Sequence, residues 1–517
     1  MSRSRRSLLG ASGLAAACAL TIACAPPPAV DPAVIIVAVR TAPNNLDPRQ
    51  GNDEMSQRVS ELVFSPLMDL GPDLRPRPHL ATRLDNPDPL TYVAHLRRGV
   101  RFHDGHELTA ADVVYTFAAF LDPAFVSPFK GAYSALAAVT ALDDYTVEFR
   151  LKTPFAAFPM QLVIPPVVPA NSGDSLRRFP VGTGPYRFVE YATDDHVTLS
   201  AFEGYFDGLP NNAGVVLRVV PDDTMRGLEL RRGSVDLVIN DLPPDIVYQL
   251  TREGRLHAET SPGLDFSYLG VNMRDPVLSD RRVRHAIAHA IDRQAIVDHL
   301  RRGLARQAFG LIPSQAWAFD PGVQQFPFDP ARAAALLDDA GFPDPDGPGP
   351  QPRLRLSLIS STNEETRLQN TIIQQDLRRV GIELDVRSYE FATFYQDVLQ
   401  GRFQLFTLQW VGGALVDPDI LRRVFHSSQL PPAGFNRGFY ANPDVDRWLD
   451  LAAAASTDDE RKQYYAKAQR LIAVDAPYIP IWNKTNVFVA QPSLTGLRMG
   501  PTGDFRGLQD VRRVTSR

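Results

Sequence analysis

Two groups of histidines have the side chains and spacing of a possible metal site. His285 and His289 are one helical turn apart, and residues 103–106 (HDGH) place two histidines around an aspartate. Imidazole and carboxylate groups are common metal ligands. However, Arg282 and Arg284 flank the first pair, and their positive charges disfavour a bound cation. The glycine in the second group favours a tight turn, so we expect no metal at either place and no cofactor.

Common catalytic motifs are missing from the chain. It contains no Gly-x-Ser-x-Gly elbow, no phosphate-binding P-loop and no His-Glu-x-x-His zinc helix. Both cysteines, Cys18 and Cys24, precede residue 25, so the rest of the chain can form no disulfide, thiol nucleophile or cysteine-bound metal cluster. Asp104 and Asp112 are better suited to orienting the backbone than to proton transfer. The sequence therefore favours a binding protein without catalytic residues, and a secreted hydrolase is the alternative.

Residues suited to ligand binding follow segments that are typical of strands. Asn44 and Asn45 come after the mostly β-branched run 34–39, which predicts a strand buried on both faces. Ligands of open α/β sheets bind beyond the ends of such strands, although a plain turn is the alternative here. Trp410 and Trp482 stand at predicted strand ends. We expect them to form apolar walls of a site, and core packing is the alternative for each.

Three further polar residues are candidates for the same site. Arg437 could bind a ligand carboxylate through two hydrogen bonds, or it could be an ordinary surface arginine. Tyr440 and Asn483 could exchange hydrogen bonds with a polar ligand. Ligand sites commonly combine apolar walls with a few polar anchors of this kind.

The first 24 residues have the pattern of an export signal. Three arginines stand among the first six residues, and an uncharged run over residues 7–23 ends at Cys24. The run is too short to favour a stable membrane span. The cysteine after small residues resembles a bacterial lipobox, so we expect lipid to be attached to Cys24. Thr21 replaces the usual leucine, Cys18 is a second candidate, and an ordinary cleaved signal or hydrophobic anchor is the alternative. The arginines leave Sec and twin-arginine export both open.

The composition is that of a globular protein. Hydrophobic residues make up 44% and charged residues 22% of the 517 residues. A net charge of -5 argues against nucleic acid as a partner. The proline-rich residues 25–32 favour a stiff tether. Residues 354–359, 371–380 and 381–386 read as strand, helix and strand, which predicts an α/β fold with parallel pairing.

Several motifs together resemble one known family. Residues 96–105 (LRRGVRFHDG) and 108–114 (LTAADVV) are similar to the signature of the extracellular solute-binding proteins of family 5, the peptide, dipeptide, nickel and oligosaccharide receptors of ABC importers. Thr109 and Asp112 also form a capping-box pattern at the start of a helix. Further matching segments follow in the family's order, at residues 180–186, 268–272, 282–287, 290–293, 328–333, 336–341, 442–446 and 476–480.

This resemblance implies a two-lobed α/β periplasmic-binding-protein fold of class II, cluster C type. It implies two hinge strands and an extra subdomain in the N-terminal lobe. The expected division is a signal peptide at 1–24, a tether at 25–32, lobe one at 33–60, 187–271 and 490–517, the inserted subdomain at 61–186, and lobe two at 272–489.

The loop after Trp410 departs from the peptide-binding members of the family. In those members an aspartate in this loop pairs with the α-ammonium of the peptide, whereas Gly412 and Gly413 stand here, with Gly413 at the matching position. A buried ammonium without a carboxylate partner costs several kcal/mol. Either Asp417 replaces the missing carboxylate or the ligand has no free amine there, and we favour the second. A turn before a helix is the alternative role for Asp417.

The resemblance implies a lipid-anchored, exported receptor that delivers a solute to an ABC permease and its ATPase subunits. Short peptides are the first expectation, and oligosaccharides are the alternative. Nickel is least expected, because no convincing histidine pair is present. We further expect a monomer at the cell envelope, with no nucleic-acid partner. A purely structural lipoprotein is disfavoured by the aromatic residues at strand ends.

Overall fold

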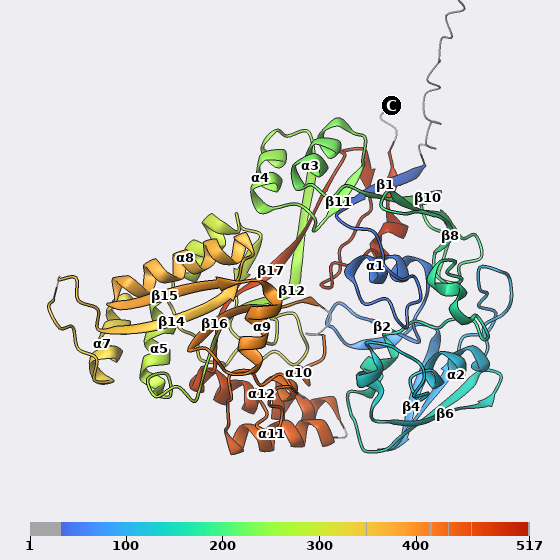
Figure 1. Cartoon of the computed structure of the whole chain (residues 1–517). Helices are drawn as coiled ribbons and strands as arrows, with labels where there is room; N and C mark the ends of the chain where they lie inside the picture. Colours follow the sequence, from blue (N-terminus) through green and yellow to red (C-terminus); the bar gives the residue numbers. More distant parts are fainter. Residues whose placement is uncertain (1–32, 348, 413–415, 433, 456, 515–517) are drawn as a thin grey trace, which may run out of the picture.

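Two lobes joined by two long strands make up the protein. The computed structural model describes residues 33–514 except 348, 413–415, 433 and 456. Figure 1 shows one lobe around β14–β16 and another around β1, β8 and β10, with β12 and β17 running between them. We call the lobe around β1, β8 and β10 lobe one and the lobe around β14–β16 lobe two. The signal sequence, the tether, Cys18 and Cys24 lie outside the described residues.

A single 11-stranded sheet extends through both lobes. Its order begins in lobe two with β15 and ends in lobe one with β8, and β13 adds to one edge of β17. The strands in this order are β15 (Ile382–Tyr389), β14 (Leu354–Ser361), β16 (Leu405–Trp410), β12 (His257–Val271), β17 (Tyr478–Ala490), β11 (Leu237–Ile239), β1 (Val34–Val39), β10 (Gly214–Val219), β9 (His196–Ala201) and β8 (Tyr186–Ala192), with β13 (Ala305–Gln307) beside β17.

The β-branched run at 34–39 forms β1, as predicted. Ile35 and Val37 are completely buried in one core cluster, and Ala38 packs in another. The strand is therefore covered on both faces, which explains its continuous apolar sequence. β1 pairs in parallel with β10. The C-terminal segment returns to this core through Leu508 and Val511.

The predicted strand–helix–strand unit is present in lobe two. β14 and β15 pair in parallel and are connected by α8 (Glu364–Arg379). The helix begins seven residues before the predicted start, because Asn363 caps it by accepting a hydrogen bond from the Thr366 amide at 3.1 Å. Two glutamates in its first turn add a favourable interaction with the helix dipole. Capping thus extended the helix beyond its apolar stripe.

Helices cover both faces of the sheet in lobe two. One face packs against α5, α7 and α8, and the other packs against α9 to α12. These helices are α5 (Arg281–Ala290), α7 (Pro330–Asp339), α9 (Phe391–Leu399), α10 (Ile420–Phe425), α11 (Pro443–Ala454) and α12 (Asp458–Asp475), and the short α6 (Arg293–Ala295) follows α5. In lobe one, α1 (Glu54–Val63), α3 (Asp223–Arg232) and α4 (Pro244–Arg252) flank the sheet.

A separate four-stranded sheet forms a compact body beside lobe one. Its order is β4-β5-β7-β6, and α2 (Ala110–Ala118) packs on it. The capping box predicted at Thr109 is present, because its amide donates to Asp112 Oδ2 at 2.8 Å. The strands are β4 (Ala81–Asp88), β5 (Thr91–Leu96), β6 (Leu136–Asp143) and β7 (Thr146–Leu151), and a small hairpin of β2 (Met68–Leu70) and β3 (Pro76–Pro78) lies nearby.

The crossing strands change register where they pass between the lobes. β12 has 15 residues and β17 has 13, and they pair antiparallel over both lobes. The register shifts between Pro262 and Phe266. Gly263 fits there because a Cβ would lie 2.8 Å from the Lys484 carbonyl oxygen. Such a bulge locally weakens the ladder. Among the described residues, no helix has the length and hydrophobicity that a membrane crossing requires.

Candidate ligand-binding site

Arg437 is the centre of a buried group of aromatic side chains in lobe two. Its side chain is only 5% exposed. Nη1 donates to the Tyr268 hydroxyl at 3.3 Å and Nη2 donates to the Tyr395 hydroxyl at 2.9 Å. The guanidinium carbon lies 4.7 Å from the centre of the Trp410 ring. Among the described residues Arg437 forms no ion pair, and its Nε has no hydrogen-bond partner.

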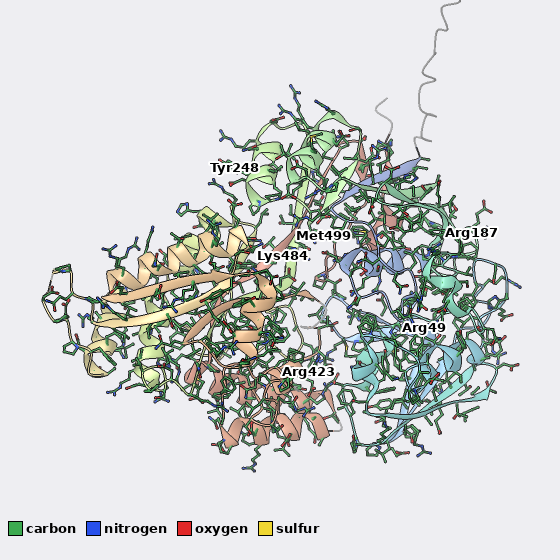
Figure 2. All side chains as sticks on the ribbon, viewed as in Figure 1. Arg49, Arg187, Tyr248, Arg423, Lys484 and Met499 are labelled. Atoms are coloured by element: carbon green, nitrogen blue, oxygen red, sulfur yellow. The ribbon has the colours of Figure 1, made fainter. Side chains whose placement is uncertain are left out.

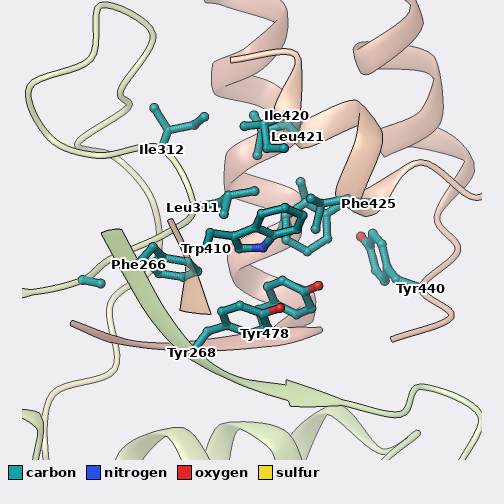
Figure 3. Packing of buried hydrophobic residues seen from close by; sticks show 14 of the residues in the cluster. Phe266, Tyr268, Leu311, Ile312, Trp410, Ile420, Leu421, Phe425, Tyr440 and Tyr478 are labelled. Atoms are coloured by element: carbon teal, nitrogen blue, oxygen red, sulfur yellow. The ribbon is translucent and has the colours of Figure 1, made fainter. Parts of the chain in front are cut away.

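Elements far apart in the sequence position this group. Tyr268 lies on β12 and Tyr478 on β17, and strand pairing stacks their rings with centres 4.0 Å apart. Trp410 ends β16, and Figure 3 shows its indole above these two tyrosines. Phe435 contacts Trp410 edge to face. We call Arg437, Trp410, Tyr268, Tyr395, Tyr478 and Phe435 the arginine–aromatic cluster.

The arginine–aromatic cluster continues to the surface on the side of α9. Tyr395 and Phe435 are half-buried. Phe391 stacks on Tyr395 with ring centres 5.7 Å apart and is 54% exposed. Val411, directly after Trp410, is 67% exposed. Exposed apolar residues beside a buried cation are suited to a ligand that combines an apolar part with a negative charge.

The loop after Trp410 is tied to the crossing strands. The Gly412 amide donates to Asp265 Oδ1 at 2.8 Å, and Asp265 Oδ2 lies 3.6 Å from Lys484 Nζ. Asp265 belongs to the bulged part of β12, and Lys484 belongs to β17. Figure 2 shows Lys484 in the region between the lobes. The loop after Trp410 is thus coupled to the strands that connect the lobes. Gly413 lies outside the described residues.

Asp417 is engaged in local structure. Its Oδ1 accepts a hydrogen bond from the Asp419 amide at 2.7 Å and lies 3.6 Å from Arg461 Nη2. These contacts form a turn before α10, which matches the alternative role that the sequence left open. Burial raises the pKa of Asp417, although Arg461 opposes this shift.

The two tryptophans lie in different environments. Trp482 is 2% exposed, and its Nε1 donates to Gln369 Oε1 at 2.7 Å. It packs with α5 and α8 on the face opposite the arginine–aromatic cluster. These contacts agree with core packing, the alternative role predicted for Trp482. Trp410 is 8% exposed and also packs in a core, but its ring contacts Arg437 and its Nε1 has no partner among the described residues.

The remaining predicted residues are distributed over the molecule. Asn45 is engaged in its own turn, because its Oδ1 accepts from the Asp47 amide at 3.0 Å and its Nδ2 donates to Gln50. Asn44 is exposed. Tyr440 is buried and donates to Asp475 Oδ2 at 2.6 Å. Asn483 is buried on β17, and its Nδ2 has no partner among the described residues.

The histidines make separate backbone contacts. His285 Nε2 lies 2.7 Å from the Val474 carbonyl oxygen, and His289 Nδ1 lies 2.8 Å from that of Pro327. His103 contacts the backbone of Gly182 and Gly184. The described part of the chain contains no group of three or more side chains arranged to hold a metal ion.

Sequence reasoning did not single out several members of the arginine–aromatic cluster. Tyr268 and Tyr478 lie in segments that resemble the family, but nothing in those segments marks them as binding residues, and Tyr395 and Phe435 lie in no such segment. The alternation of apolar residues in β12 is a signal for burial only. Strand pairing and the packing of α9 are needed to place these hydroxyls against one guanidinium.

Comparisons with known proteins agree with one another. The model of the bacterial extracellular solute-binding proteins, family 5, matches residues 75–431. The glutathione-binding protein GsiB of Salmonella choleraesuis is 31% identical over 497 residues, which cover 92% of this chain and 94% of the relative.

Solved structures give the same result. The ABC transporter substrate-binding protein CtaP of Listeria monocytogenes superposes with a TM-score of 0.83 at 27% identity, covering 93% of this chain and 99% of that one. DppA of Helicobacter pylori, in complex with the peptide STSA, has a TM-score of 0.73 at 26% identity, covering 93% and 98%. The predicted periplasmic-binding-protein fold is thereby confirmed.

Proposed function

The chain belongs to the bacterial extracellular solute-binding proteins of family 5, and on this basis we propose that it captures short peptides by their free carboxylate. It is a substrate-binding protein of an ABC importer, as predicted from the resemblance of its motifs. In the proposed role, the ligand binds between the lobes and is delivered to a permease with ATPase subunits. The binding protein itself changes shape and performs no chemistry.

The unpaired Arg437 is the observation that carries this proposal. A guanidinium removed from water without a carboxylate is costly, because hydroxyl groups compensate only part of its lost hydration. Its free Nε and the exposed Phe391 beside the arginine–aromatic cluster would suit a carboxylate with an apolar neighbour. GsiB is named for binding glutathione, and the DppA structure holds a peptide. Both ligands carry free carboxylates.

The proposal gives the amine of the ligand a smaller role. Gly413 replaces the aspartate expected in peptide-binding relatives, and Asp417 is paired with Arg461. We therefore expect N-acetylated peptides to bind nearly as well as free ones, whereas C-terminal amidation should weaken binding.

Calorimetric titration with glutathione and with tripeptides tests the proposal. Native mass spectrometry of the protein from expressing cells first identifies the captured ligand. We expect Arg437→Met to weaken peptide binding by about 10- to 100-fold, the range for losing a charged hydrogen-bond donor. Arg437→Lys should recover only part of it, because lysine lacks the planar fork. The control is Arg447→Met, which removes an exposed arginine that also lies over an aromatic ring.

Equal binding by wild type and Arg437→Met would exclude Arg437 as the anchor. A captured sugar would instead support the oligosaccharide alternative, and equal affinity for peptides with amidated C-termini would exclude the carboxylate as the recognised group. Retained binding by Arg447→Met shows that a loss at Arg437 is specific.

A further inference from the structure

A cavity of about 600 Å³ lies within lobe two. The exposed residues beside the arginine–aromatic cluster, Phe391 and Val411, do not line it. Its wall is formed by residues 305–312 and 319–327, by the end of β17 and by parts of α10 and α12. Phe266 comes from the crossing strand β12, and all other lining residues lie between residues 293 and 480. The volume is in the range of sites for small organic ligands.

The wall of this cavity is mainly apolar. Figure 3 shows Leu311 and Ile312 in the loop that faces Phe266 and Phe425. No acidic residue is among the lining residues that the structure describes. Glutamines are the uncharged polar residues of the lining. The larger apolar side chains of the wall are Phe266, Val297, Phe309, Leu311, Ile312, Phe319, Val323, Phe326, Leu421, Phe425, Ile472 and Tyr478.

Two arginines interrupt the apolar wall. Arg293 is 6% exposed, and its other nitrogens donate to backbone carbonyls, including those of Pro480 at 2.6 Å and Phe326 at 3.0 Å. Its Nη2 is buried and has no partner among the described residues. Arg306 is half-buried, and its Nε has no partner there either. Burial lowers the pKa of Arg293 to about 10, so the group remains cationic at neutral pH.

We propose that this cavity is a second binding site and that it takes an amphipathic monocarboxylate, with a carboxylate oxygen on Arg293 Nη2 and an apolar body on the Phe266 wall. Three features favour this chemistry. The site has positive charge without acidic residues, so an anion is preferred to a cation. Arg293 has only one free nitrogen, which suits one carboxylate oxygen better than a multiply charged phosphate. The apolar wall gives the remainder of the ligand a surface that excludes water.

The cavity and the proposed peptide site have different arginines. Arg437 does not line the cavity, and neither do Trp410 or Gly412. Tyr478 is the one member of the arginine–aromatic cluster that also lines the cavity, where α10, α12 and β17 contribute to the wall. The two sites therefore share the Tyr478 ring but would anchor a carboxylate on different arginines, Arg293 and Arg437.

Titration of the purified full-length protein with decanoate tests the proposal. We expect one decanoate per chain, with 1-decanol at least tenfold weaker because it lacks the charge. Ala473→Trp introduces a large ring into the cavity wall, and we expect it to weaken decanoate at least tenfold. Ala466→Trp is the matched control, because Ala466 is on the same helix but does not line the cavity.

Arg306→Gln provides a second variant if Ala473→Trp fails to fold, and we expect a loss of at least threefold. The proposal is wrong if decanoate does not bind, or if a folded Ala473→Trp or Arg306→Gln variant binds it as wild type does. Arg437→Met distinguishes the two sites. If that variant alone abolishes decanoate binding, the probe occupies the peptide site and no second site exists.

Discussion

His103 is held in the neutral form by two backbone contacts. Its Nδ1 accepts a hydrogen bond from the Gly182 amide at 3.3 Å, so the proton resides on Nε2, which donates to the Gly184 carbonyl at 3.1 Å. Burial lowers the pKa of His103 to about 4 from an ordinary value of 6.5. What looked in the sequence like part of a metal site is a neutral link between a turn and a glycine-rich segment.

The lowered pKa of His103 predicts that the folded protein loses stability in acid. Between pH 6.5 and 4 the unfolded chain binds a proton at this histidine and the folded chain does not, so stability falls as pH falls through this window. The full effect is about 3 kcal/mol. Urea unfolding at pH 7 and pH 4.5 should show a smaller pH dependence for His103→Gln than for wild type. His106→Gln, in the same turn but exposed, is the control, and an equal pH dependence for all three proteins would contradict the assignment.

Trp410 combines packing with contact to Arg437. Because it is 8% exposed in the core of lobe two, we expect Trp410→Ala to lower the free energy of unfolding by about 3–5 kcal/mol. Trp410→Phe should retain most of this stability. Urea unfolding measures the loss. An unchanged unfolding free energy in Trp410→Ala would show that the ring is a ligand wall and contributes little to the core.

Among the elements, the β2–β3 hairpin connects the lobes directly. Leu74 at its turn is fully buried against the core of lobe two. The neighbouring Asp73 carbonyl accepts a hydrogen bond from the Trp317 amide at 3.2 Å. Arg75 lies over the Trp317 ring at 5.0 Å and 3.6 Å from Asp458. Leu74 has a φ of 64°, which is unusual for a side chain of this size.

We expect this hairpin to stabilise the closed arrangement of the lobes. Burial of a leucine contributes about 2 kcal/mol, so Leu74→Ser should weaken peptide affinity roughly 30-fold if binding requires closure. Small-angle scattering should show a larger radius of gyration for this variant without ligand. Leu142→Ser is the control, because Leu142 is 56% exposed on β6. If Leu74→Ser has the peptide affinity and radius of gyration of wild type, the hairpin does not stabilise the closed arrangement.

For the whole molecule, the arrangement of the sheet favours rotation of the lobes where β12 and β17 cross between them. Only β12 and β17 continue from lobe to lobe among the described strands. Their bulge near Gly263 and the Asp265–Lys484 pair lie at the crossing. We infer that rotation of the lobes about this crossing opens and closes the peptide site. The Gly412 contact with Asp265 couples the binding loop to that rotation.

The attachment of the whole protein to a membrane is a separate proposal. We expect Cys24→Ala to move the protein from the membrane fraction to the soluble fraction, because the lipid would be lost. Cys18→Ala should stay in the membrane fraction. Immunoblotting of fractionated cells measures both. Membrane retention of Cys24→Ala together with release of Cys18→Ala would assign the lipid to Cys18, and retention of both would exclude lipidation at a single cysteine.

The sequence by itself determined the local elements, the family and the fold class. The β-branched run of β1, the capping box at Thr109 and the strand–helix–strand unit around α8 each have a local physical cause, because propensity, capping and apolar spacing act over a few residues. The solute-binding family was also recognisable, because its motifs mark turns and helix starts in a fixed order. Arg437 could be named as a candidate from its residue type, and Trp410 from its residue type and its place at a predicted strand end.

Only the tertiary structure decided which candidates share one environment. Trp410 and Trp482 are equivalent in sequence, yet they lie on opposite faces of one sheet, and only Trp410 contacts Arg437. Tyr268 and Tyr478 are 210 positions apart and stack because β12 and β17 pair. Register and sheet order depend on contacts between distant segments, and a pattern that predicts burial does not specify what a side chain is buried against.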